Sequence, residues 1–147
     1  TQTPSSAASD VYKRQVLNFL KKHKEVTKVI YSTEHEKKIA DRAKQYLKGG
    51  NGPMIGIELK GGIEAGKKFI ESLKMFYHVA NIGDARSLAI HPASTTHSQL
   101  NEKELAATGV TQSYVRLCIG IEHIDDIIDD LDQALNKSSK GSLKAVS

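Results

Sequence analysis

Residues 81–122 decide the fold, and they read NIGDARSLAIHPASTTHSQLNEKELAATGVTQSYVRLCIGIE. The pattern predicts a short apolar strand, a loop rich in hydroxyl and imidazole groups, a short helix and a second strand. Because side chains alternate in direction along a strand, Val115, Leu117 and Ile119 should face the core from the second strand. Arg116 then lies in mid-strand on the opposite face.

Arg116 needs an anionic partner in this apolar setting, because its guanidinium keeps its charge. The donors of the guanidinium form a fixed fork that matches a carboxylate. Two interpretations remain open from residue type and position alone. One is a structural ion pair with an Asp or Glu of the chain, and the other is a binding site for the carboxylate of a ligand.

The composition is that of one ordinary domain. The chain has 147 residues, of which 39% are hydrophobic and 26% are charged, so Leu, Ile and Val must supply most of the core in the absence of Trp. A single cysteine excludes an internal disulfide, and we expect a cytoplasmic protein without a signal segment or a membrane-spanning run. The net charge of +4 is not gathered into a basic stripe, so we expect neither nucleic acid nor a membrane as a partner.

The two ends of the chain differ from the middle. Residues 1–15 read TQTPSSAASDVYKRQ, show no apolar period and lack an initiator Met, so we expect a disordered leader that is partly foreign to the fold. Residues 16–137 carry the periodic segments and form the expected domain. Residues 138–147 are expected to be a disordered Ser/Lys tail.

Helices and strands alternate along the expected domain. The patterns predict helices over 16–24, 33–47, 64–74, 101–107 and 124–135, and strands over 26–31, 53–60, 75–79, 87–91 and 114–119. Capping-box spacings at Thr33–Glu36 and Asn101–Glu104 mark two of the helix starts. This order predicts an α+β fold in which helices cover one face of a mostly antiparallel sheet.

The same patterns assign apolar side chains to the core and acidic side chains to solvent. The side chains expected to face inward include Ile39, Ala43, Tyr46 and Leu47 of the second helix, and Leu88 and Ile90 of the fourth strand. The acidic side chains expected on the solvated face of the last helix are Asp125, Asp126, Asp129, Asp130 and Asp132.

The histidines and the cysteine suggest two further kinds of site, a metal site and a nucleophilic thiol. The candidate zinc ligands are His78, His91, His97 and Cys118, but their spacing matches no tight ligand pair, so we expect no metal. Cys118 has no base beside it in sequence and is expected to be an inert packed thiol.

The loop at 91–97, HPASTTH, offers several hydroxyls within a short span. Such hydroxyls commonly satisfy local backbone groups, but one of them could also hold the Arg116 guanidinium in place. Asn81 follows a strand and could supply an amide to the same anion.

Several separate segments resemble one known family. They are NIGD at 81–84, HPASTTHSQL at 91–100, VRLCIGIE at 115–122 and HIDDIIDDLDQAL at 123–135, together with KGGIEAGKKFIESLK at 60–74. The chain from about residue 16 onward resembles the C-terminal domain of the pyridoxal-phosphate-dependent enzymes of cysteine and methionine metabolism, the trans-sulfuration enzymes. The O-acetylhomoserine sulfhydrylase branch is the most similar.

The resemblance implies roles for three residues. Arg116 matches the arginine that grips the α-carboxylate of the substrate, and Thr96 matches a threonine that helps to orient it. Asn81 occupies a position that also contacts this carboxylate, and Cys118 stands where relatives usually carry Ser. The lysine and the other groups that bind pyridoxal phosphate belong to the family's N-terminal domain and are not recognisable here, so no catalytic or cofactor-binding residue is expected in this chain.

The resemblance also implies a reaction. It would be a γ-replacement that makes homocysteine from O-acetylhomoserine and sulfide or a thiol, in a homo-oligomer that is a tetramer in relatives. The alternative is a stand-alone α+β module that binds a small amino acid or a partner chain through the sheet face around Arg116 and Ser87, without catalysis.

Overall fold

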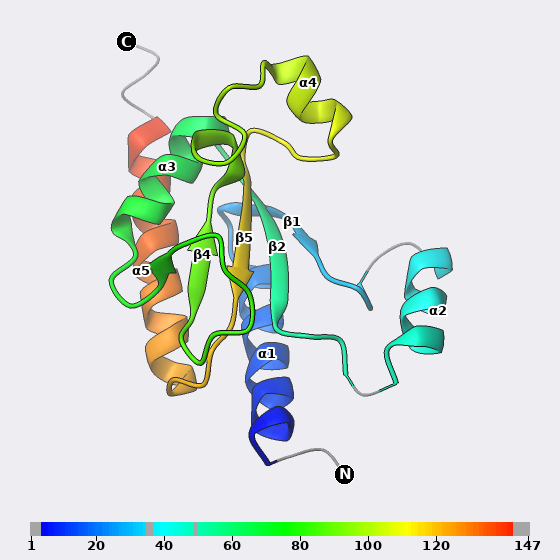
Figure 1. Ribbon diagram of the computed structural model, residues 1–147. Coiled ribbons are helices and arrows are strands. Elements are labelled where there is room, and N and C mark those ends of the chain that lie inside the picture. Colours follow the sequence, from blue (N-terminus) through cyan, green and yellow to red (C-terminus); the bar gives the residue numbers. More distant parts are fainter. Residues whose placement is uncertain (1–3, 35–36, 49, 143–147) are drawn as a thin grey trace.

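The computed structural model describes residues 4–34, 37–48 and 50–142 (Figure 1). The elements follow in the order α1 (Pro4–Lys22), β1 (Val26–Ile30), α2 (Lys37–Tyr46), β2 (Met54–Leu59), α3 (Gly62–Ser72), β3 (Tyr77–His78), β4 (Leu88–Ile90), the 3-10 helix η1 (Pro92–Ser94), α4 (Glu102–Ala107), β5 (Tyr114–Cys118) and α5 (Ile124–Ser142). The expected order of helices and strands is confirmed, with η1 as an addition. No helix among the described residues is long and apolar enough to cross a membrane.

Five strands form one sheet in the order β1-β2-β5-β4-β3. The pairs β1–β2, β2–β5 and β4–β5 are antiparallel, and only the short β3 runs parallel to its neighbour β4. The sheet is therefore mostly antiparallel, and the α+β prediction is confirmed. The strand with Arg116, β5, lies at the centre of the sheet.

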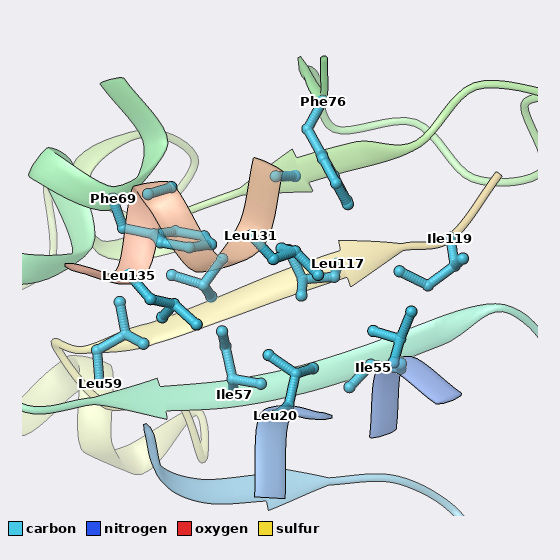
Figure 2. Packing of buried hydrophobic residues seen from close by; sticks show 14 of the residues in the cluster. Leu20, Ile55, Ile57, Leu59, Phe69, Phe76, Leu117, Ile119, Leu131 and Leu135 are labelled. Atoms are coloured by element: carbon cyan, nitrogen blue, oxygen red, sulfur yellow. The ribbon is translucent and has the colours of Figure 1, made fainter. Parts of the chain in front are cut away.

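The main core lies between one face of the sheet and the helices α1, α3 and α5 (Figure 2). Ile57 from β2 and Leu117 from β5 are fully buried there, and they pack with Leu20 from α1, Phe69 from α3 and Leu131 from α5. Each strand contributes alternate residues to this face, as the period of two requires. The predicted orientation of Val115, Leu117 and Ile119 toward the core is confirmed.

Both chain ends are more helical than expected. The prediction of disorder over 1–15 is wrong for its described part, because α1 begins at Pro4. The helix is fixed where Val16 and Leu20 enter the core, and once a helix is nucleated each further residue adds a hydrogen bond at low cost. For the same reason α5 continues through Ser142, although a tail was expected from residue 138. Residues 1–3 and 143–147 lie outside the described part.

Helix α2 does not bury its apolar side. Ala43 is buried, but Tyr46 is 74% exposed, and Ile39 and Leu47 are exposed as well. The prediction that these three side chains face inward is wrong, because α2 stands apart from the sheet and the other helices (Figure 1). At the predicted capping box of this helix, Glu36 lies outside the described residues.

Strand β4 faces opposite to the prediction. Ala89, paired with Leu117, points into the main core, whereas Leu88 and Ile90 pair with Cys118 and Arg116 and share their face of the sheet. All three β4 residues are buried, because β4 is covered on both faces. A continuous apolar run of three residues does not indicate by itself which side chains face the main core. The face that carries Arg116 is thus partly apolar and partly covered.

Asp130 of α5 is a buried carboxylate rather than part of a solvated face. It accepts hydrogen bonds from the backbone N–H groups of Lys74, Met75 and Phe76 over 2.8–3.3 Å, and from the side-chain amide of Gln133 at 3.0 Å. These contacts tie the turn after α3 to α5 and set the start of β3. Its prediction as a solvated residue is wrong, because the helical period cannot show that a turn distant in sequence presents its N–H groups there.

Replacement of Asp130 by Ala should lower the free energy of unfolding by about 2–4 kcal/mol, since several buried N–H groups lose a charged acceptor. Denaturant unfolding of the chain measures this change. The matched control is Asp129→Ala, at the exposed neighbouring position, which should change the free energy by less than about 0.5 kcal/mol. Equal effects of the two substitutions would contradict the role of the buried carboxylate.

His91 is fully buried just before η1 and fixes the start of the hydroxyl-rich loop. Its Nε2 donates to the carbonyl oxygen of Gln112 at 2.7 Å, which leaves Nδ1 as the acceptor for the Ser94 hydroxyl at 2.8 Å. Gly66 of α3 lies against the ring, where a β-carbon would overlap it. Burial lowers the pKa of His91 below its ordinary value, and the bond to Gln112 opposes this effect only in part.

Stability should therefore fall as the pH decreases from about 6.5. The pKa of His91 is lower in the folded chain than the ordinary 6.5, so the unfolded chain takes up this proton first. The contribution of neutral His91 to the free energy of unfolding is complete above pH 6.5, the ordinary pKa that applies to the unfolded chain. This contribution is lost as the pH falls through the lower pKa of the folded chain. Denaturant titrations between about pH 8 and about pH 5 measure the slope, which His91→Gln should reduce. An unchanged slope in that variant would argue against His91 as its origin.

Candidate functional site

Arg116 is half-buried at the centre of the sheet, opposite Gly56 of β2 and Ile90 of β4. Within the described residues it forms no ion pair with an Asp or Glu. Its guanidinium Nη2 donates to the backbone carbonyl oxygen of Asn81 at 3.3 Å. A carbonyl carries no net charge, so it does not neutralise the guanidinium. The described part of the chain thus contains no structural ion pair for Arg116.

An open pocket of about 300 Å³ borders Arg116. It lies between the end of β1 and the strands β2 and β5, and its lining includes Ser32, Asn51, Met54, Gly56 and Tyr114. A cavity of this size can hold a molecule as large as an amino acid. The charged side chain at its border and the polar groups in its lining make it the candidate binding site.

Tyr114 reaches across to β2 because residue 56 is a glycine. A β-carbon at Gly56 would lie only 2.6 Å from Cε2 and 2.8 Å from the hydroxyl of Tyr114. The phenol head therefore occupies the space that a side chain at position 56 would fill, directly across the sheet from Arg116. Burial raises the pKa of the Tyr114 hydroxyl, and the nearby Glu58 carboxylate raises it further, whereas the charge of Arg116 lowers it in part. The hydroxyl therefore stays protonated and can donate a hydrogen bond.

Asn81 and Arg116 are in contact, but the backbone of Asn81 makes this contact and its side chain does not. The Asn81 carbonyl accepts from Arg116, while its side-chain oxygen accepts from the backbone N–H of Ile82 at 2.9 Å. The loop between β3 and β4 that carries Asn81 passes in front of β4 and β5 (Figure 1). A contact of the Asn81 side chain with a substrate stays a prediction.

Ser87 and Glu122 fix the end of the loop that carries Asn81. The sequence patterns indicated no such role for either residue. The Glu122 carboxylate accepts from the Ser87 backbone N–H at 2.7 Å and from the Ser87 hydroxyl at 2.8 Å. The Ser87 oxygen in turn accepts from the N–H of Gly120 at 3.0 Å. Ser87 is fully buried and its hydroxyl is engaged, so it cannot form part of a binding surface with Arg116. No local signal identifies this pair, because its members are 35 positions apart.

Thr96 does not contact Arg116 in the described part of the chain. It is exposed, and its hydroxyl forms a hydrogen bond with Nδ1 of His97 at 2.8 Å. The role of orienting the arginine therefore rests on the family resemblance and stays a prediction.

The capping box at Asn101 and Glu104 is present and begins α4 as expected. Cys118 is buried, as a packed thiol should be. Among the residues that the structure describes, no three His, Cys, Asp or Glu side chains gather as metal ligands.

The pocket beside a buried lysine does not match a site for pyridoxal phosphate. A buried lysine, Lys13, lies beside a pocket of about 260 Å³, but its ammonium is over the Tyr31 ring, 5.5 Å from the centroid. The acid in this pocket, Glu34, already pairs with Lys21 at 2.6 Å. No aspartate lines the pocket to pair with the pyridine nitrogen.

Curated relatives of the chain are enzymes of sulfur amino-acid metabolism. The O-acetyl-L-homoserine sulfhydrylase of Leptospira meyeri is 49% identical over 122 residues, which cover 82% of this chain and 28% of that protein. The O-acetyl-L-homoserine sulfhydrylase 1 of Thermus thermophilus is 54% identical over 95 residues, or 65% of this chain and 23% of that protein. The chain thus spans less than a third of the length of these relatives.

Solved structures share the fold. A putative O-acetylhomoserine (thiol)-lyase from Campylobacter jejuni, with a pyridoxyl-lysine monophosphate, superposes with a TM-score of 0.78 at 37% identity, over 88% of this chain and 31% of that one. Cystathionine gamma synthase from Xanthomonas oryzae in complex with cystathionine gives a TM-score of 0.78 at 27% identity, over 92% of this chain and 35% of that one. The family model for Cys/Met metabolism PLP-dependent enzymes matches residues 9–136. On this evidence the chain belongs to the pyridoxal-phosphate-dependent enzyme family of cysteine and methionine metabolism.

Proposed function

We propose that this chain is the C-terminal domain of a pyridoxal-phosphate-dependent O-acetylhomoserine sulfhydrylase, which makes homocysteine from O-acetylhomoserine and sulfide or a thiol. Its part in the reaction is to bind the α-carboxylate of the amino-acid substrate through Arg116. The similarity to O-acetylhomoserine sulfhydrylases supports the reaction.

The proposal is based mainly on the surroundings of the Arg116 guanidinium. The guanidinium borders an open pocket, and among the described residues only a carbonyl oxygen accepts from it. A bound carboxylate would supply the missing charge and would engage two donors of the fork at once. Two parallel hydrogen bonds fix the direction of the substrate as well as its position, and correct orientation removes much of the entropic barrier of a reaction.

Other parts of the full-length enzyme follow from the proposal. Pyridoxal phosphate is bound by an N-terminal domain outside this chain, and the enzyme is a cytoplasmic homo-oligomer, most simply a tetramer. Thr96 and the Asn81 side chain complete the carboxylate site once the remainder of the enzyme is in place.

Exposed apolar side chains favour this proposal over a stand-alone binding module. Ile39 and Tyr46 of α2 lie in solvent, as does Leu47 directly after this helix. Met54 of β2 and Ile82 of the loop that carries Asn81 are exposed as well. A larger enzyme would cover much of this surface, whereas a stand-alone module gains nothing from it.

In the full-length enzyme, Arg116→Ala should raise KM for O-acetylhomoserine while the cofactor stays bound. Loss of a bidentate charged contact costs about 2–4 kcal/mol, which corresponds to an increase of roughly 30- to 1000-fold. Arg116→Lys keeps the charge without the fork and should give an intermediate KM. Steady-state kinetics measure KM, and the cofactor absorbance reports occupancy.

The matched control is Arg42→Ala, which removes an exposed arginine on α2 and should leave KM unchanged. A KM for Arg116→Ala within about twofold of the original, a free-energy change below about 0.5 kcal/mol, would refute the assignment of Arg116 to the carboxylate.

The 147-residue chain alone should not bind pyridoxal phosphate covalently, because the proposal places the cofactor-binding lysine in the N-terminal domain. Mixing with the cofactor, reduction with borohydride and mass spectrometry would test this. Stoichiometric labelling of a single lysine would contradict the proposal, whereas scattered trace labelling of exposed lysines would agree with it.

A further inference from the structure

The pocket beside Arg116 contains a hydroxyl that the fold leaves unused. Ser32 Oγ is shielded from solvent and has no hydrogen-bond partner among the residues that the structure describes. Buried hydroxyl groups in proteins are nearly always paired, and an unpaired one costs about 1–3 kcal/mol. Ser32 lines the same pocket as Arg116, so a ligand in that pocket would offer the missing partner.

Tyr114 contributes a second donor to the pocket. Its phenol head stands over Gly56, on the face of the sheet that also carries Arg116. No hydrogen bond from its hydroxyl to another described residue is formed. The protonated hydroxyl therefore has a hydrogen to donate to a ligand.

Asn51 adds an amide to this lining, and its side chain likewise makes no hydrogen bond within the described part of the chain. Arg116 at the border is cationic, whereas Ser32, Asn51 and Tyr114 are neutral groups that can each donate a hydrogen bond. The pocket therefore has two chemically different parts. The Arg116 cation suits a carboxylate, and the neutral donors suit an uncharged acceptor.

We propose that Ser32, Asn51 and Tyr114 form a subsite for the substrate's side chain, which selects α-amino acids whose side chain carries an ester or other carbonyl oxygen. This inference rests on the proposed function, because it takes Arg116 as the anchor of the α-carboxylate. With the carboxylate held at Arg116, the side chain enters the neutral part of the pocket. A carbonyl oxygen there accepts from Ser32 and Tyr114, while an apolar side chain leaves both donors unpaired.

This subsite requires a glycine at position 56. Any side chain at position 56 would displace the Tyr114 ring, since even a β-carbon comes within 2.6 Å of it. The pair of a glycine and a tyrosine on neighbouring strands therefore places the phenol hydroxyl in the pocket.

The experiment compares two ligands in the full-length enzyme. O-acetyl-L-homoserine, whose side chain ends in an acetyl ester, is the substrate, and L-norleucine, whose side chain has no acceptor, is tested as a competitive inhibitor. Tyr114→Phe and Ser32→Ala should each raise KM for the ester by about five- to tenfold, since each removes one hydrogen bond. Both should leave the inhibition constant of L-norleucine within about twofold.

The controls separate this inference from the proposed function. Arg116→Ala should weaken both ligands, since both carry the α-carboxylate, and Tyr77→Phe on the exposed strand β3, outside this pocket, should weaken neither. If Arg116→Ala weakens both and the two hydroxyl variants change neither ligand, or change both equally, the subsite is refuted and the function stands. If Arg116→Ala changes neither, the function itself is refuted. Should Tyr114→Phe fail to fold, Ser32→Ala alone decides the outcome.

Discussion

The alternation of side chains along β5 is the constraint on which the rest of this structure depends. β5 lies between β2 and β4, so all its backbone groups can pair within the sheet and only its side chains distinguish the two faces. Val115 and Leu117 enter the core under α1, α3 and α5. Arg116 must then point the other way, where its charge can meet a ligand. A shift of one residue in register would bury the guanidinium among apolar side chains.

Two carboxylates hold the loops around this strand. Asp130 accepts from three consecutive backbone N–H groups before β3, and Glu122 accepts from the N–H and hydroxyl of Ser87 before β4. The segment from the turn before β3 to the start of β4, which carries Asn81, is therefore fixed at its two ends by acids from distant parts of the chain. Short loops without apolar contacts of their own need such anchors, since their ordering entropy is not offset by burial. The position of the Asn81 carbonyl next to Arg116 depends on both anchors.

The face of the sheet with Arg116 and the helix α2 are less covered than the core. Tyr46 and Ile39 are in solvent, and the pocket at Arg116 is open. The chain spans 28% of its Leptospira relative, so most of such a protein lies outside these residues. The exposed apolar side chains and the unneutralised guanidinium have the same explanation if that larger part closes over this face.

Periodicity and turn residues were sufficient to predict the order of the elements, the mostly antiparallel sheet and the orientation of Val115, Arg116 and Leu117. The order of the elements and these orientations depend on neighbours one to four positions apart, which the sequence displays directly. The family resemblance added the prediction that Arg116 binds the substrate. The sequence also located the capping box at Asn101, because its two partners are three residues apart.

Contacts between distant residues were decided by the tertiary structure alone. The reversal of Leu88 and Ile90, the burial of Asp130, the pairing of Ser87 with Glu122 and the phenol of Tyr114 over Gly56 all require strands and helices to be in place first. The exposure of α2 belongs to the same class, since an amphipathic helix shows which side is apolar and not whether anything covers it. The sequence determined which residues could face a core or an anion, and the packed chain determined which of them do, because burial and hydrogen bonding depend on partners far away in sequence.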